Sequence, residues 1–259
     1  MKVRLVAIPS LILVGTICAI GALLEYIVDA RIFVSSFAEA PSRVLLALPE
    51  ALAVSWGPIM QTLAEVGASF VLAMLIGLSL GLGLGSVRSA YQTLNGALTA
   101  LYSIPKVTLL PALILWVGLG PDAVITFATL EACVPIVLVL AGAVRDFDPR
   151  LILVARAMGA TQAQTQLKVV IPGLRSQFLV SVQIGLVLCF LGVILSQMFL
   201  GFGGIGGLLL NDAYQLRTAQ LYAVSIIFAS LVVGVLTLTR QVLGRFGAGM
   251  EPFMLAQRP

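Results

Sequence analysis

Three ionisable residues interrupt long apolar runs of this sequence: Glu65, Lys106 and Glu131. A charge at the centre of a bilayer costs about 2.5–3.5 kcal/mol on insertion scales, so such a residue is expected to face protein or a water-filled path. Lys106 suits a path that passes an anionic or zwitterionic solute, with Glu131 tuning the choice of solute. The equally weighted alternative is a structural ion pair between Lys106 and Glu131. Glu65 falls near the outer end of its apolar run, where we expect it to lie close to the interface.

The usual residues of enzyme active sites are absent or scattered. The sequence has no histidine, which removes the commonest general base and metal ligand. Its three cysteines, Cys18, Cys133 and Cys189, are far apart within apolar runs, and we interpret them as small buried hydrophobic residues. No P-loop and no pattern of paired carboxylates occurs. The sequence therefore predicts no catalytic site, no bound metal and no cofactor held by this chain.

The composition is that of a membrane protein. Of 259 residues, 60% are hydrophobic and 10% are charged, and the mean hydropathy is +1.10. Soluble domains carry about 25% charged residues, and several apolar runs here reach the roughly 20 residues that a spanning helix needs. The net charge of +4 is explained by basic cytoplasmic loops rather than by nucleic acid. We expect an all-α protein whose surroundings are a lipid bilayer.

Six apolar segments are predicted to cross the membrane, at about residues 6–28, 58–85, 94–117, 123–144, 178–200 and 221–243. The first has a signal peptide as its alternative, but its apolar run is longer than the usual 7–15 residues of such a peptide, so a retained anchor is favoured. Residues 29–57 are predicted to be an external connector with a short interfacial helix. This divides the chain into an anchor and connector (1–57), a permease domain (58–245) and a cytoplasmic tail (246–259).

Glycine and proline mark irregular places in the predicted spans. Gly77, Gly81 and Gly85 recur every four residues, so they share one helix face and allow another helix to approach closely. Pro105 and Pro111 each remove a helix hydrogen bond and predict kinks or a break in the third span. The run "GFGGIGG" (201–207) is predicted to be a flexible turn.

The distribution of Lys and Arg predicts the orientation, because cytoplasmic loops carry an excess of both. Six spans place both termini on one side, and with that side inside, eleven basic residues face the cytoplasm against three outside. The inner set is Lys2, Arg4, Arg88, Arg145, Arg150, Arg156, Lys168, Arg175, Arg240, Arg245 and Arg258, and the outer set is Arg31, Arg43 and Arg217.

A polar segment, "VARAMGATQAQTQLKVVIP" (154–172), separates the fourth and fifth spans on the predicted cytoplasmic side. Before it, Asp148 is a candidate N-cap and Pro149 suits the first helical position. Gly159 can adopt the positive φ that ends a helix. These signals predict a first short helix that ends in an elbow at Gly159–Ala160.

A second short helix is predicted after the elbow. Thr161 and Gln164 have the spacing of a capping box, and Pro172 is expected to stop the helix before the chain re-enters the bilayer. Two short helices joined by an elbow suit docking into a groove of another protein. The alternative is an ordinary solvated loop, which needs neither the glycine elbow nor the two caps.

This segment resembles the EAA loop of importer-type ABC transporter permeases. Gly159, Ala160 and Pro172 match its pattern, Ala155 matches its second alanine, and departures occur at Leu153, Val154 and Ser176. The runs "SIPKVTLLPALILWVGLG", "TLAEVGASFVLAMLIGLSLGLGLGSVRS" and "SQMFLGFGGIGGLLLNDA" resemble the nitrate/sulfonate/taurine branch of these permeases. The resemblance covers about residues 58–245.

The resemblance implies the type I importer permease fold, with six transmembrane helices and a cytoplasmic coupling helix, in the bacterial inner membrane. It implies a second permease copy in a homodimer, cytoplasmic ATPase subunits that bind ATP and Mg²⁺, and an external or periplasmic solute-binding protein. The solute would be small and anionic or zwitterionic, such as nitrate, a sulfonate or taurine, or a heterocyclic precursor. The residues that would contact the ATPase are Ala155, Arg156, Gly159, Ala160, Thr161, Gln164, Lys168 and Pro172.

Two other classes of function compete with this interpretation. A secondary solute transporter would work without an ATPase partner, but the halves of the sequence show no convincing internal repeat, and such a carrier does not need the elbow. A non-transporting scaffold would not need a proline-broken span or charges inside the membrane.

Overall fold

A computed structural model describes residues 25, 39–201 and 203–247, which are helical almost throughout and contain no strand in those ranges. The predicted all-α class is confirmed. The predicted first span, apart from Glu25, and nearly all of the predicted tail lie outside the described residues. The elements are α2 (Pro41–Ser86), α3 (Arg88–Ser103), η1 (Lys106–Leu109), α4 (Leu110–Val117), α5 (Pro121–Arg145), α6 (Pro149–Ala157), α7 (Gln162–Thr165), η2 (Gln166–Val170), α8 (Ile171–Gly173), α9 (Arg175–Leu200), α10 (Gly204–Tyr214) and α11 (Thr218–Gly247).

Four helices of the described chain are long and apolar enough to cross a membrane: α2, α5, α9 and α11. A fifth span is counted if α3 and the η1–α4 segment are taken together, although they are bent by 83° at the break between them. The described residues thus contain four or five of the six predicted spans.

The second predicted span begins earlier than the sequence indicates. We expected a separate interfacial helix before a span that begins at Pro58, but α2 is one continuous helix from Pro41, with Pro49 and Pro58 inside it. Its 46 residues correspond to about 69 Å at 1.5 Å per residue, more than twice the roughly 30 Å of the hydrocarbon core. A straight α2 that crossed the apolar layer perpendicular to it would therefore extend beyond it.

The third predicted span is broken. The helix α3 ends at Ser103, and the chain resumes as the short 3₁₀ helix η1 at Lys106. Pro105 lies in the break as predicted, whereas Pro111 lies in the first turn of α4, where its missing N–H would have no helical partner in any case. Only one of the two prolines therefore interrupts the span.

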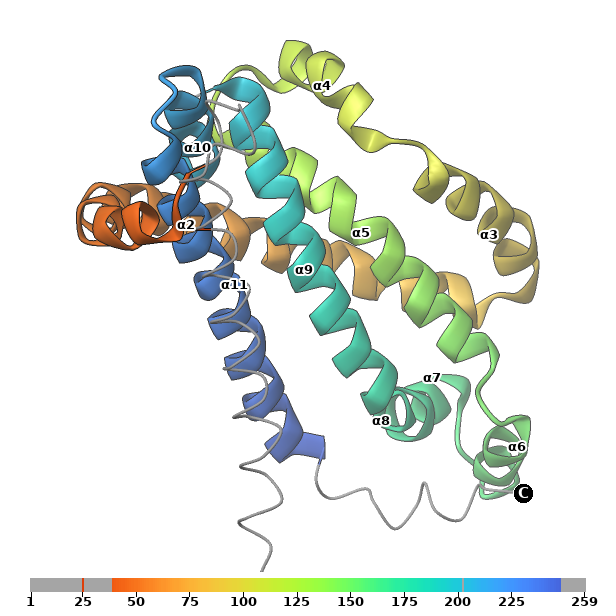
Figure 1. The fold of residues 1–259 in the computed structure, drawn as a ribbon. Helices are drawn as coiled ribbons and strands as arrows, with labels where there is room; N and C mark the ends of the chain where they lie inside the picture. The colour runs from red at the N-terminus through yellow and green to blue at the C-terminus, as the bar shows by residue number, and fades with distance from the viewer. Residues whose placement is uncertain (1–24, 26–38, 202, 248–259) are drawn as a thin grey trace, which may run out of the picture.

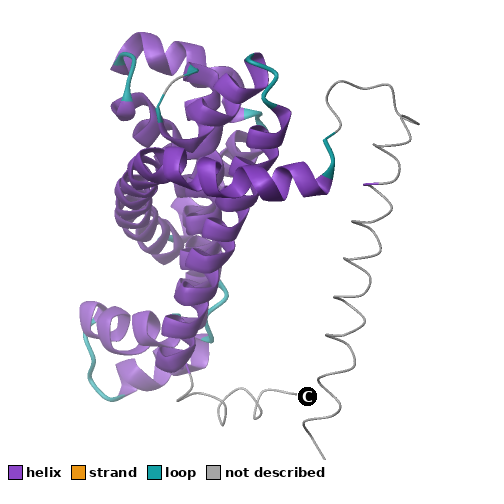
Figure 2. Ribbon diagram, turned by 60° about the vertical axis from the view of Figure 1, so that its left-hand side comes forward, coloured by secondary structure: helices purple, strands orange, loops and turns teal. Residues whose placement is uncertain are grey.

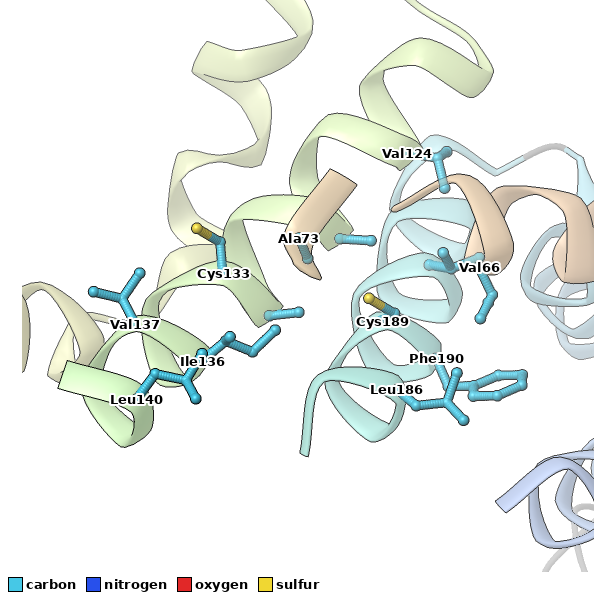
Figure 3. Close-up of a cluster of buried hydrophobic side chains, with 13 residues drawn as sticks. Val66, Ala73, Val124, Cys133, Ile136, Val137, Leu140, Leu186, Cys189 and Phe190 are labelled. Atoms are coloured by element: carbon cyan, nitrogen blue, oxygen red, sulfur yellow. The ribbon is translucent and has the colours of Figure 1, made fainter. Parts of the chain in front are cut away.

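The core lies where α5 packs between α2 and α9 (Figure 1). Figure 3 shows Val66 and Ala73 of α2, Ile136 of α5 and Phe190 of α9 within one buried cluster. Cys133 and Cys189 belong to this cluster as free, buried thiols. Both therefore pack as small hydrophobic residues, while Cys18 lies outside the described chain.

The repeated glycines of α2 face α5. A Cβ atom built on Gly77 would lie 2.5 Å from Ile136 Cγ2, and one on Gly81 would lie 2.8 Å from Leu140 Cβ. One on Gly85 would meet Val144 Cβ at 2.6 Å. The absence of a side chain at these three positions lets the two helices approach to the observed separation.

The short helices gather at the two ends of the long ones. In Figure 1, α6, α7 and α8 lie at the lower ends of α5 and α9, and α4 and α10 lie at the upper ends; Figure 2 shows the same separation after rotation. The 26 residues of α9 span about 39 Å, more than the hydrocarbon core. The two groups of short helices are therefore placed at opposite surfaces of the membrane.

Candidate functional site

The loop between α5 and α9, residues 148–174, begins with a capped helix. The Asp148 side chain accepts a hydrogen bond from the Arg150 N–H at 2.9 Å, which satisfies one of the free donors of the first turn of α6. The helix ends at Ala157, and Gly159 follows with a φ of +87°. Glycine adopts this left-handed conformation without strain, so the chain turns sharply there.

The second half of the loop begins at a complete capping box. The Gln164 N–H donates to Thr161 Oγ1 at 3.3 Å, and the Thr161 N–H donates to Gln164 Oε1 at 2.9 Å. Each side chain thus satisfies a backbone donor that the helix leaves free. The two short helices and the glycine elbow predicted from the sequence are present.

Pro172 does not stop the second helix, contrary to our expectation. Helical backbone continues from α7 through the π-helix η2 and through α8, and it ends at Leu174. A proline cannot donate to the carbonyl four residues earlier. The wider turn of η2, in which the Ile171 N–H donates to Gln166 O, carries the chain past that missing bond.

The loop is fixed to the membrane helices by a small apolar cluster. Val144, Val170 and Leu174 are buried together, and Phe147 packs against them. A Cβ atom on Gly173 would lie 2.5 Å from Phe147 Cε2, so only glycine fits under that ring. The end of the loop therefore moves with the end of α5 rather than independently of it.

The eight predicted contact residues divide by exposure. Ala155 is buried, Ala160 and Pro172 are half-buried, and the remaining five are exposed on the outer side of the loop: Arg156, Gly159, Thr161, Gln164 and Lys168. Ala155 thus packs inside the elbow. Sequence reasoning gave no role to four exposed apolar side chains of the same loop, Leu153, Val154, Met158 and Leu167, of which Met158 is 83% exposed. The sequence feature that could have identified them is the presence of apolar residues within a polar segment.

Lys106 and Glu131 form an ion pair, with Lys106 Nζ 3.2 Å from Glu131 Oε2. Their side chains are 8% and 16% exposed, and Lys106 Nζ lies 4.9 Å from the centre of the Tyr102 ring. The pair joins the break in the third span to α5. Of the two alternatives derived from the sequence, the structure contains the ion pair. Both side chains keep some exposure, so the pair is compatible with a role in a solute path.

Glu65 lies in a buried polar network that reaches the start of α10, and our expectation that it lies near the membrane interface stays a prediction. Glu65 is 3% exposed. Gln61 Nε2 donates to its Oε1 at 2.9 Å, and Gln197 Nε2 of α9 donates to its Oε2 at 2.7 Å. Thr62 also exchanges hydrogen bonds with the Gln197 amide. Sequence reasoning missed this network, whose signal is the run "QTLAE" (61–65) in an apolar helix.

The network also fixes the start of α10. Gly204 N–H donates to Gln61 Oε1 at 3.0 Å, Ile205 N–H to Thr62 Oγ1 at 3.0 Å and Gly206 N–H to Gln197 Oε1 at 2.9 Å. These are donors that a helix leaves free in its first turn. The run "GFGGIGG" was predicted to be a flexible turn, but from Gly204 onward it is helical and bonded, because side chains of α2 and α9 supply the missing acceptors.

Asp212 of α10 is buried without a partner. It is 1% exposed, and neither carboxylate oxygen has a hydrogen bond. Burial raises the pKa of this carboxyl above its usual value, and the positive charge of Arg217 opposes that shift. Ser55 Oγ on α2 is likewise buried and unpartnered.

The fold is that of a transport permease. Residues 70–250 match the family described as "Binding-protein-dependent transport system inner membrane component", and the chain belongs to this family. It is a multi-pass protein of the inner membrane.

Curated relatives are transport permeases. The putative aliphatic sulfonates transport permease protein SsuC of Bacillus subtilis is 26% identical over 70% of this chain and 65% of its own length. The taurine transport system permease protein TauC of Escherichia coli is 21% identical over 88% of this chain and 87% of its own. A trimethylamine N-oxide permease, TmoV of Ruegeria pomeroyi, is 27% identical, and the match spans only 27% of its length.

The fold also matches a solved transporter. Two inward-facing crystal forms of the MetNI methionine ABC transporter superpose with TM-scores of 0.64 and 0.66 at 24% identity. They cover 72% and 73% of this chain, and 93% and 94% of the matched chains. At this identity the likeness supports the type I importer permease fold alone.

Proposed function

We propose that this chain is the transmembrane permease subunit of an ATP-driven importer, coupled to a separate cytoplasmic ATPase through residues 149–172. The observation that carries the proposal is the geometry of the loop. A rigid elbow at Gly159–Ala160 holds Met158 and Leu167 exposed beside Arg156 and Lys168. Exposed apolar side chains rimmed by charges are typical of a protein interaction site.

The assembly that follows from this role has several components. Two permease copies form a homodimer, each bound to one ATPase subunit, and ATP with Mg²⁺ is bound by the ATPase. An external or periplasmic binding protein delivers the solute. Both termini of the permease lie in the cytoplasm, which agrees with the excess of eleven basic residues over three on that side.

Coupling follows from the way the loop is anchored. When ATP closes the two motor subunits, the docked loops are drawn together. The contact between Phe147 and Gly173 and the buried cluster around Val170 transmit that motion to α5. Packed helices of this kind move as rigid bodies between two arrangements, so the cavity of the dimer opens alternately to each side.

The ion pair of Lys106 and Glu131 is proposed to line the solute path. The solute is small and anionic or zwitterionic, in the range of sulfonates and taurine named for the relatives SsuC and TauC. Lys106 lies in the broken segment of the third span, and its partner is the only carboxylate in ion-pair contact with it among the described residues. An anionic group that reaches Lys106 would replace Glu131 as the partner, which favours anions over cations.

Docking of the loop is tested by site-directed crosslinking. Single cysteines at positions 162–166, in a background without the three native cysteines, are co-expressed with a candidate ATPase subunit. We expect a crosslink at one or more of positions 162–164, which are exposed, whereas Thr165 is buried. A cysteine at Gln215 is the control and should give none, because this exposed residue directly follows α10, which lies at the opposite end of the molecule (Figure 1). Lack of crosslinking at every loop position would contradict the docking.

The role of the ion pair is tested by charge reversal. Lys106→Glu and Glu131→Lys should each abolish uptake, because each leaves two like charges in the membrane. The double variant restores the pair and should recover folding, yet it places the cation on α5 and changes the preference among anionic solutes. Full uptake by either single variant would contradict a role in transport.

A further inference from the structure

A groove of about 420 Å³ lies between the loop ends of α2, α5 and α9, and it is lined by apolar side chains and one cation. Leu78 and Leu82 come from α2, Leu140 from α5 and Phe178 from α9, and Arg175 is the single charged residue of the lining. This volume falls within the range of about 300–1,000 Å³ that small-molecule sites occupy. The groove suits a molecule with a long apolar part and an anionic group.

The groove lies at the level where lipid headgroups meet hydrocarbon. Arg175 is the first residue of α9, Leu82 lies one turn from the end of α2, and Leu140 lies five residues before the end of α5. All three helices thus present the groove at the membrane surface that carries the 148–174 loop. An arginine at a helix end near this level extends toward the headgroups while its stem packs on apolar surface.

Arg175 has no acidic partner in the described chain. The ion pairs found there belong to Arg43 with Glu39 and to Lys106 with Glu131. Glu25 accepts hydrogen bonds from Ser42, which lies at the opposite end of α2 from the groove. The guanidinium also lies at the N-terminus of a long helix, where the backbone dipole adds positive potential.

We propose that this groove binds an anionic phospholipid, with an acyl chain along Leu78, Leu140 and Phe178 and the phosphate at Arg175. Charge complementarity selects this occupant over a zwitterionic lipid, because basic pockets between transmembrane helices bind anionic headgroups.

A bound lipid would contact the coupling loop directly. Ile171, Pro172 and Leu174, where the loop returns to the membrane, also line the groove. Leu174 is at the same time part of the buried cluster with Val144 and Val170. The site thus provides a route by which the composition of the membrane acts on the segment that connects the ATPase to the permease.

The test uses quenching of a tryptophan in the groove by brominated lipid. The full chain carries Phe178→Trp, with Trp56→Phe and Trp116→Phe, and is reconstituted in phosphatidylcholine nanodiscs. In one sample a minor fraction of the lipid is phosphatidylglycerol with brominated chains. In the other sample the same fraction is phosphatidylcholine with brominated chains. We expect phosphatidylglycerol to quench several-fold more strongly at equal mole fraction.

Charge variants identify the headgroup contact. Arg175→Gln should lower the preference for phosphatidylglycerol about fivefold, which corresponds to about 1 kcal/mol per basic residue near the membrane surface, and Arg175→Lys should retain most of it. Arg88→Gln is the matched control, because Arg88 also begins a helix and does not line the groove. It should leave the preference unchanged.

Three outcomes would overturn the proposal. Equal quenching by both lipids would show that the groove does not select charge. An equal loss in Arg88→Gln would show that general attraction to the surface is responsible. Protection of the tryptophan from both lipids would show that a protein segment, either a second copy or the first span, fills the groove.

Discussion

The 148–174 loop and the seam, by which we mean the buried contact of α2 with α9 and α10, differ in the range of the hydrogen bonds that stabilise them. In the loop, the hydrogen bonds that set the shape join residues two or three positions apart, as in the Asp148 cap and the Thr161–Gln164 box. In the seam, Gln197 of α9 reaches Thr62 and Glu65 across 135 and 132 positions of the chain. The capping hydrogen bonds of the loop are exposed, whereas those of the seam are buried.

The difference bears on how each region responds to change. An exposed cap has water as an alternative partner, so its loss is mild and local. A buried amide that bonds a carboxylate has no alternative, because water does not reach it and the low dielectric makes each unpaired group costly. Long-range buried contacts should therefore control the stability of the whole fold, and the local ones the geometry of a single surface.

The largest effect is expected for Gln197→Leu. This change leaves a Glu65 oxygen, Thr62 Oγ1 and the Gly206 N–H each without one bond. A buried unsatisfied group costs about 1–3 kcal/mol, and more when it is charged, so we expect a loss of several kcal/mol in the free energy of unfolding, measured by denaturant titration in micelles. Gln215→Leu is the control, since exposed Gln215 bonds only Asn211. Equal losses of unfolding free energy in both variants would contradict the expected difference between buried and exposed hydrogen bonds.

The next effect separates two glycines of one helix. Gly81→Ala places a Cβ atom 2.8 Å from Leu140 Cβ, whereas Gly83→Ala meets nothing within 4 Å. Overpacking costs about 1–3 kcal/mol, while alanine in a helix gains up to about 1 kcal/mol over glycine. Gly81→Ala should therefore lower the free energy of unfolding and Gly83→Ala should raise it. The same sign for both would show that α2 and α5 do not pack closely there.

The cap of the loop should give a smaller and local effect. Thr161→Ala removes the acceptor of the Gln164 N–H, which costs about 1 kcal/mol, and Thr161→Ser should retain most of the bond. Amide hydrogen exchange over residues 162–166 should speed up several-fold, while the unfolding midpoint of the whole protein stays nearly constant. A shift of the global midpoint as large as that of Gly81→Ala would contradict the local character of the loop.

The smallest effect is a pH dependence at Asp212. Burial raises the pKa of this carboxyl, with Arg217 opposing the shift, so the folded state holds the proton more tightly than the unfolded state. Its contribution to stability is therefore full below the unfolded pKa and is lost as pH rises toward the folded pKa. Asp212→Asn should remove this dependence of the unfolding free energy on pH between the unfolded and the folded pKa. Above the folded pKa, the variant should be more stable than the unchanged protein. An unchanged pH profile would show that Asp212 is solvated.

Several features of the fold were predictable from the sequence because their causes are local. The apolar runs predicted α5, α9 and most of α11, and the spacing of Asp148, Thr161 and Gln164 predicted the caps of the loop. The regular spacing of Gly77, Gly81 and Gly85 predicted a close approach by another helix. The spacing did not say which helix would approach.

Other features had no local signal that distinguished the alternatives. The second span was predicted to begin at Pro58, yet α2 runs through Pro49 and Pro58 as one helix. The sequence was equally consistent with Lys106 and Glu131 lining a solute path and with an ion pair between them. Only the fold brings them within 3.2 Å. For the same reason the sequence did not indicate that Glu65 is buried against its distant partner Gln197.

By itself, the sequence determined that this is an all-α membrane protein with an elbowed loop, because hydropathy and helix caps act within a few residues. Only the tertiary structure decided that Glu65, Gln197 and the start of α10 form one network, that α5 fills the glycine face of α2, and that Arg175 stands at an apolar groove. These features depend on which residues, far apart in the chain, meet once the helices pack. No local propensity carries that information.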